Sequence, residues 1–172
     1  CELPVVINSG SGNQGMTCSL PVLEYAKELH TNEDKTYRAL ALSNLIAIHQ
    51  KTGIGRLSAY CGAVSAGAAA GAGIAYLCGG GYEEVIHTVV NALAIVSGMV
   101  CDGAKASCAA KIAASVDAGI LGYNMYLQGQ QFYAGDGIIT KGIEGTIDNV
   151  GRLGKDGMKE TNEEIIRIMI ND

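Results

Sequence analysis

The stretch SAYCGAVSAGAAAGAGIAYLC, residues 58–78, decides how the chain is expected to fold. It carries no charged residue and is built mainly from Ala, Gly and Ser. Its length would suit a transmembrane helix, but Ala and Gly contribute little free energy of membrane insertion. Small residues such as Ala63, Gly67 and Gly71 instead let two helices approach each other closely. We therefore predict the buried central helix of a helical bundle, with no membrane partner.

The composition fits a core made of small and aliphatic side chains. The 172 residues include 24 Gly, one Phe and no Trp, and this length suits one domain with a sizeable core. The net charge is −5, and without a basic patch we expect no nucleic-acid partner. The first residue is Cys1 rather than Met, which indicates a piece of a longer protein.

Apolar periodicity and turn residues predict an all-α fold, a compact helical domain over residues 1–172. Thr31 and Asn32 precede two acidic residues and are typical of a helix N-cap. Gly79–Gly81 are expected to end the central helix, and only the lead-in at residues 1–7 could be extended. The expected helices are 17–30, 33–51, 58–78, 82–99, 103–119, 140–154 and 160–170.

A Gly-rich loop, NSGSGNQG at residues 8–15, precedes the first expected helix. Free N–H groups at a helix N-terminus can hold a carboxylate or a phosphate. The loop is not a P-loop, because no Gly-Lys-Ser/Thr follows it, and no βαβ unit surrounds it. The alternative is a tight turn in which Asn8, Ser9, Ser11 and Asn13 are simply solvated.

Six cysteines occupy positions 1, 18, 61, 78, 101 and 108. They do not form the pattern of a short secreted domain, so we expect a reducing, cytoplasmic compartment and free or metal-bound thiols. A single buried cysteine usually acts as a small apolar side chain. That is the expectation for Cys18 and Cys78.

The segment CDGAKASC, residues 101–108, has two cysteines seven positions apart. On a straight helix they would be separated by about 10 Å along the axis, whereas a disulfide needs Cα atoms within about 7 Å. Asp102 is expected to cap the helix, with Cys101 in the preceding loop and Cys108 on the helix. The two thiols could then flank a group larger than one ion, with Cys61 as a third ligand. Spacing alone leaves the alternative of core cysteines open.

Four segments taken together resemble the iron–sulfur L-serine dehydratase alpha-domain family, most closely its L-cysteine desulfidase-like branch. These segments are INSGSGNQGMTCSLPVLEYAK (7–27), KTGIGRLSAYCGAVSAGAAAGAGIAYLCGG (51–80), SGMVCDGAKASCAAKI (97–112) and IDNVGRLGKDGMKETN (147–162). The resemblance spans essentially the whole chain in order. Since family members are longer, it implies the C-terminal part of a longer enzyme.

The resemblance implies a [4Fe-4S] cluster held by Cys61, Cys101 and Cys108, with one iron open to the substrate. It also implies β-elimination from a small amino acid, giving pyruvate, ammonia and sulfide or water. The substrate-binding turn of the family corresponds to Asn8, Ser9, Gly10, Ser11, Gly12 and Asn13. Serine dehydratases carry a longer CDP…PC segment where this chain has CDGAKASC, and this favours L-cysteine over L-serine.

The base that removes the α-proton is not assigned by the sequence, which offers His49, Lys51, Lys105 and Lys111. The expected partners are the amino-acid substrate, the N-terminal part of the same enzyme and a second copy of the chain. The alternative function is a non-catalytic helical module that binds a small anionic metabolite at the Gly-rich loop.

Overall fold

The computed structural model describes residues 3–55 and 57–171, and Cys1 lies outside this part. The described residues form helices and no strand, so the predicted all-α fold is confirmed. The elements are α1 (Gly12–Glu28), α2 (Glu33–Ile54), α3 (Gly62–Leu77), α4 (Tyr82–Val96), α5 (Cys108–Leu127), α6 (Ile143–Arg152), the π-helical turn η1 (Leu153–Gly157) and α7 (Lys159–Asn171).

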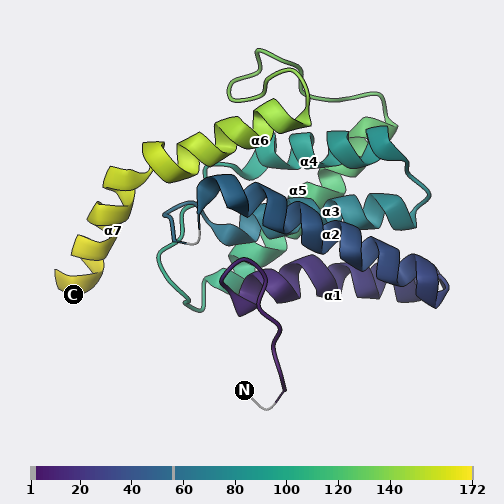
Figure 1. Cartoon of the computed structure of the whole chain (residues 1–172), viewed down its shortest axis with the longest axis horizontal. Helices are drawn as coiled ribbons and strands as arrows, with labels where there is room; N and C mark the ends of the chain where they lie inside the picture. Colours follow the sequence, from purple (N-terminus) through teal and green to yellow (C-terminus); the bar gives the residue numbers. More distant parts are fainter. Residues whose placement is uncertain (1–2, 56, 172) are drawn as a thin grey trace.

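Helix α3 is the centre of the bundle, as its composition predicts. Nearly all of its residues are buried, and it packs against α1, α2, α4 and α5 (Figure 1). Its glycines make this possible: a Cβ on Gly67 would collide with Ser115, and one on Gly71 would lie 2.7 Å from Gly119 Cα. In the described part of the chain, no helix is both long and apolar enough to cross a membrane.

Helix α1 begins at Gly12, five residues before the expected start at Thr17. The reason is a cap: Ser11 Oγ accepts a hydrogen bond from the Gln14 amide at 3.4 Å, which satisfies one free N–H of the first turn. The Gly-rich loop is therefore shorter than expected. Gly12 and Asn13 lie in the first turn of the helix rather than in a loop.

Helix α2 confirms the predicted cap, because Asn32 Oδ1 accepts from the Lys35 amide at 2.9 Å. The expected end at residue 51 is wrong: the helix continues to Ile54 and stops at Gly55, whose φ is +91°. Glycine adopts this left-handed conformation without a steric penalty, so it ends helices readily.

Helix α5 starts at Cys108 and continues to Leu127, so the predicted range of 103–119 is wrong at both ends. Asp102 is not the N-cap, which is Ser107. The Asp102 carboxylate instead accepts a hydrogen bond from Lys111 Nζ. Cys101 does lie in the loop and Cys108 on the helix, as expected. At the C-terminus, α7 extends away from the bundle and packs only on η1 among the described elements (Figure 1).

Candidate functional site

A cavity of about 680 Å³ opens where α1, α3 and α5 begin. Its wall includes the thiol-bearing residues Cys61, Cys101 and Cys108, the start of α1 and two lysines, Lys51 and Lys111. These groups come from four separate regions of the sequence. The fold thus brings the three predicted cysteines to one cavity, and it brings part of the predicted loop there as well.

The positions of Cys61 and Cys101 are set by a short antiparallel bridge between Tyr60 and Val100. The Cys61 amide donates to the Met99 carbonyl at 3.1 Å, and the Cys101 amide donates to the Ala59 carbonyl at 2.6 Å. The two cysteines are therefore diagonal neighbours on one face of the bridge, a relation that places residues about 7–8 Å apart. This pairing also explains why α3 begins at residue 62 rather than 58.

Cys108 is the first residue of α5 and reaches the cavity from the other side of the loop that starts at Cys101. Its Sγ lies 3.5 Å from the Lys105 amide, which donates to it, and 3.5 Å from the Gly103 carbonyl oxygen. Gly103 has a φ of +89°. This tight turn folds the 101–108 segment back on itself instead of continuing the helix.

The cavity wall is electrostatically suited to negative charge. Helices α1, α3 and α5 all present their N-terminal residues to it, and helix N-termini favour anions and thiolates. Burial raises the pKa of the Cys61 thiol, while the nearby backbone amide of Ala63 acts to lower it. Cys101 and Cys108 act to raise this pKa and Lys111 to lower it. Burial is the largest of these influences, so the Cys61 thiol by itself is held in its neutral form.

The side chains that line the cavity determine which kind of metal group could bind there. Among the described residues, no three His, Cys, Asp or Glu side chains are arranged to hold a single metal ion. Three thiols from different elements nevertheless line one cavity of about 680 Å³. Thiolates are the ligands of iron–sulfur clusters, so these residues fit a cluster of several atoms better than one ion. Their role as ligands stays a prediction.

The Gly-rich loop divides into two parts with different surroundings. Residues 10–13 line the cavity, whereas Asn8 and Ser9 do not. Asn8 Nδ2 donates to Asn44 Oδ1 at 2.9 Å, and Ser9 Oγ donates to Asn8 Oδ1 at 2.7 Å. Asn8 and Ser9 thus fasten the loop to α2, while residues 10–13 face the space where a ligand could bind.

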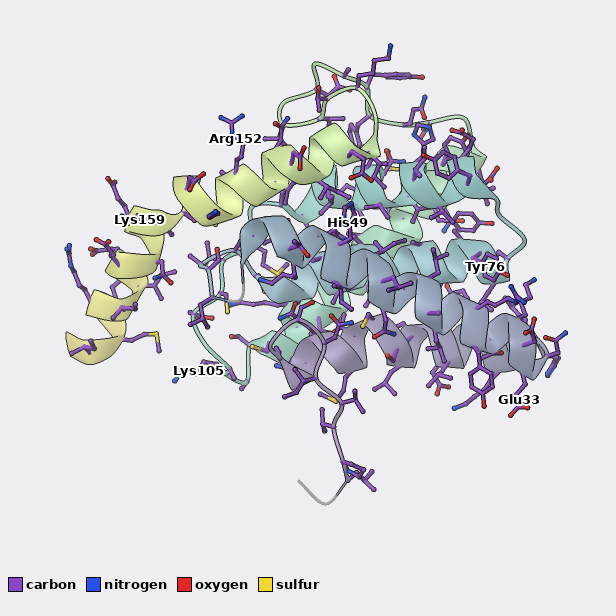
Figure 2. All side chains as sticks on the ribbon, viewed as in Figure 1. Glu33, His49, Tyr76, Lys105, Arg152 and Lys159 are labelled. Carbon is purple, nitrogen blue, oxygen red and sulfur yellow. The ribbon has the colours of Figure 1, made fainter. Side chains whose placement is uncertain are left out.

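Two of the four candidate bases lie away from the cavity wall. His49 is half-exposed and contacts Glu144 on α6 at 2.8 Å. Lys105 is exposed and projects from the loop at the edge of the molecule (Figure 2). Neither residue lines the cavity.

The other two candidates, Lys51 and Lys111, line the cavity but differ in their partners. Lys111 Nζ donates to Asp102 Oδ1, and this contact raises the pKa of the lysine. Lys51 is only 6% exposed, and no hydrogen bond or ion pair of its amine occurs among the described residues. Burial lowers the pKa of Lys51, against the opposing influence of Cys101 and Cys61. Of the two lysines in the cavity wall, Lys51 is thus the one whose pKa is lowered.

Sequence reasoning missed two polar residues of the wall, Gln14 and Tyr60. Gln14 Oε1 and the Tyr60 hydroxyl are buried and have no hydrogen-bond partner in the described part of the chain. Gln14 packs so closely on Gly62 that a Cβ there would collide with the carboxamide. The buried position of Gln14 in the first turn of α1 is visible only once the helix start is known.

Comparisons with known proteins identify the family. The family described as serine dehydratase alpha chain matches residues 1–167. This match covers nearly the whole sequence and includes the cysteines and the Gly-rich loop. The chain therefore belongs to the serine dehydratase alpha chain family.

Several bacterial proteins resemble the chain along almost its full length. A UPF0597 protein of Desulfitobacterium hafniense is 72% identical over 171 residues, covering 99% of this chain and 40% of the relative. A UPF0597 protein of Treponema denticola is 53% identical over 172 residues, covering 100% of this chain and 40% of the relative. The chain thus spans about 40% of the length of these curated relatives. No solved structure matches it.

Proposed function

We propose that the chain is the C-terminal, cluster-binding part of a cytoplasmic, iron–sulfur-dependent lyase that performs β-elimination on a small amino acid. L-cysteine is preferred over L-serine, and the products are pyruvate, ammonia and sulfide or water. One observation supports this most: three thiols, a helix N-terminus and a buried unpaired lysine line the same cavity. The family membership agrees with this chemistry.

The substrate carboxylate would bind at the start of α1. The amides of Gly12 and Asn13 belong to the first helical turn and lie at the cavity wall. Such amides donate charge-assisted hydrogen bonds to a carboxylate. Gly10 has a φ of +96° and no side chain, so the backbone of the loop can approach the ligand closely.

Cys61, Cys101 and Cys108 would hold a [4Fe-4S] cluster at the other side of the cavity. When bound, the cluster supplies a Lewis-acidic iron for the β-leaving group of the substrate. The N-termini of α3 and α5 stabilise the thiolates that this ligation requires. The Lys111 ammonium adds positive charge beside the thiols and is held in place by Asp102.

Lys51 would act as the base. Its neutral amine takes the α-proton of the substrate, the electron pair forms the Cα–Cβ double bond, and the β-substituent leaves with its bonding electrons. The departing thiolate or hydroxide accepts a proton and is released as sulfide or water. The aminoacrylate product tautomerises to an imine, and one water molecule hydrolyses it to pyruvate and ammonia. The burial of Lys51 in the cavity wall suits this role, because a desolvated lysine is more easily deprotonated.

Anaerobic reconstitution tests the proposal. Iron and sulfide content, the visible absorbance of the cluster and the turnover of L-cysteine and L-serine are measured on the same samples. The protein extended to the length of its relatives should bind about four irons and produce pyruvate, as a [4Fe-4S] enzyme does. Cys61→Ser, Cys101→Ser and Cys108→Ser should each reduce iron content.

Cys78→Ser is the matched control, since Cys78 does not line the cavity and is exposed, so the expectation that it is buried is wrong. Its iron content should equal that of the parent protein. Full iron content in all three cavity variants would contradict the proposed ligands. A colourless protein that binds carboxylates without turnover would instead favour the alternative, a helical module that binds a small anion.

A further inference from the structure

Exposed apolar side chains surround the mouth of the cavity. Val5, Ile7, Met16 and Leu57 all line it, and their exposed fractions are 38%, 67%, 37% and 96%. Met169 of α7 completes the group: its methyl carbon lies 3.6 Å from where a Cβ on Gly103 would be, and Gly103 also lines the cavity. We call these five residues the mouth patch. They come from the N-terminal segment, α1, the α2–α3 loop and α7.

Two properties of the patch indicate that another polypeptide covers it. A large apolar side chain such as Leu57, which is almost fully exposed, is unfavourable in water, and contiguous apolar patches usually mark interaction surfaces. Residues 3–7 run without backbone hydrogen bonds to the other described residues. In Figure 1 the segment starts away from the bundle and then runs up to the start of α1, where Val5 and Val6 lie against Gly12 and Gly15. Both features suit a surface that is completed by further chain.

The relatives indicate what that chain is. They match this sequence over 40% of their own length, so about three-fifths of each relative lies outside the match. We infer that the mouth patch is the docking surface for this additional polypeptide, which closes the cavity. A chain that enters through residues 3–7 arrives directly at the patch, because Val5 and Ile7 are part of the cavity wall.

Closure would exclude water from the wall that contains Lys51 and the three cysteines. The role of the closed cavity in catalysis rests on the proposed function, but the docking itself does not require any reaction. Its test can therefore use cluster-free protein and a readout of surface accessibility alone. Failure of the docking would leave the proposed lyase activity standing, and loss of the lyase proposal would leave the docking standing.

Hydroxyl-radical footprinting tests the inference on two proteins. One is the 172-residue chain, and the other is a chimera in which this chain replaces the matching 171 residues of the Desulfitobacterium relative. Met16 and Met169 should be labelled at least several-fold more slowly in the chimera. Met125 is the control: it is half-buried near the end of α5, about 25 Å along the helix from Cys108, and its labelling should not change.

A pair of variants in the chimera sharpens the result. Leu57→Asp should return the labelling of Met16 and Met169 to the rate in the 172-residue chain. Leu45→Asp is the control variant, because Leu45 is 64% exposed on α2 and does not line the cavity. It should leave the labelling of Met16 and Met169 as slow as in the unchanged chimera. Equal labelling in the chimera and the shorter chain would overturn the inference. So would concentration-dependent protection in the shorter chain, which would make a second copy the occupant.

Discussion

Gly71 of α3 packs against Gly119 of α5 so closely that a Cβ on Gly71 would lie 2.7 Å from the Gly119 Cα. Real Cβ atoms do not approach backbone atoms to this distance, so the two helices require glycine at the contact. Both helices begin at the cavity, α3 beside Cys61 and α5 with Cys108. The close contact in the middle of the bundle therefore fixes the separation of two predicted ligands at its end.

Gly71→Ala should destabilise the fold by about 1–3 kcal/mol, because the added methyl forces the helices apart. This loss should appear despite the higher helix propensity of Ala, which by itself would stabilise by about 1 kcal/mol. Chemical denaturation measures the change. Gly98→Ala is the control, since no atom lies within 4 Å of the added Cβ there and its φ is not positive. A Gly71→Ala protein more stable than the parent would contradict the packing argument.

The central helix α3 could be predicted from its composition. Its many Ala and Gly residues are typical of a helix that packs against other helices on every side. The convergence of Cys61 and Cys101 was less accessible to sequence reasoning. It depends on the hydrogen bond from the Cys101 amide to Ala59, a contact between positions 42 residues apart in the sequence. Nothing in a local pattern specifies such a bridge.

The wrong predictions of where α1 and α5 begin also result from contacts that a local sequence pattern does not specify. Asp102 has the residue type of an N-cap, but its carboxylate binds Lys111 nine positions later. The sequence places Ser11 in a loop, although its hydroxyl accepts a hydrogen bond from the Gln14 amide and caps the start of α1. Local propensity allows both outcomes in each case. The choice is made by tertiary contacts, which also decide that Lys51 rather than His49 faces the cavity.

The proposed carboxylate site is best tested at Asn13. Gly10→Val is unsuitable, because Gly10 has a φ of +96° and a β-branched residue there is strained whether or not the loop binds substrate. Asn13 is helical and lines the cavity. Asn13→Ala keeps the backbone amide and removes the side-chain carboxamide, so it should weaken substrate binding by about 1–2 kcal/mol through the loss of one side-chain hydrogen bond. KM and iron content are measured together, and an unchanged KM with full iron would argue against a binding role for Asn13.

The proposed base can be separated from a merely structural lysine by chemical rescue. Lys51→Ala should lower kcat strongly, by a factor of about 10²–10⁴, while iron content stays that of the parent. Small primary amines added to the solution should restore part of the activity, because they can occupy the space of the missing side chain and accept the α-proton. Lys111→Ala serves as comparison, since its amine pairs with Asp102. Absence of rescue, together with unimpaired exchange of the substrate α-proton with deuterium from the solvent, would remove Lys51 from the role of base.

The stability of the cluster-free protein should also report the state of Lys51. Burial lowers the pKa of Lys51 from its ordinary value of 10.5, so between the folded and unfolded pKa values the unfolded chain binds more protons. Stability therefore rises with pH through that window. The unfavourable contribution is fully present below the folded pKa and disappears above the unfolded one. Each unit of pKa depression corresponds to about 1.4 kcal/mol.

Lys51→Met removes this buried charge and keeps an apolar side chain of similar length. The variant should be more stable than the parent at pH 7, and the difference should shrink as the pH approaches 10.5, the ordinary pKa of lysine. Lys141→Met, which changes an exposed lysine, should show no such pH dependence. Denaturant unfolding of the three proteins measures the effect. The pH is varied from about 6 to about 10, a range of about four units below the ordinary lysine pKa. A Lys51→Met protein that is less stable at every pH would mean that the Lys51 amine has a stabilising partner in the folded chain.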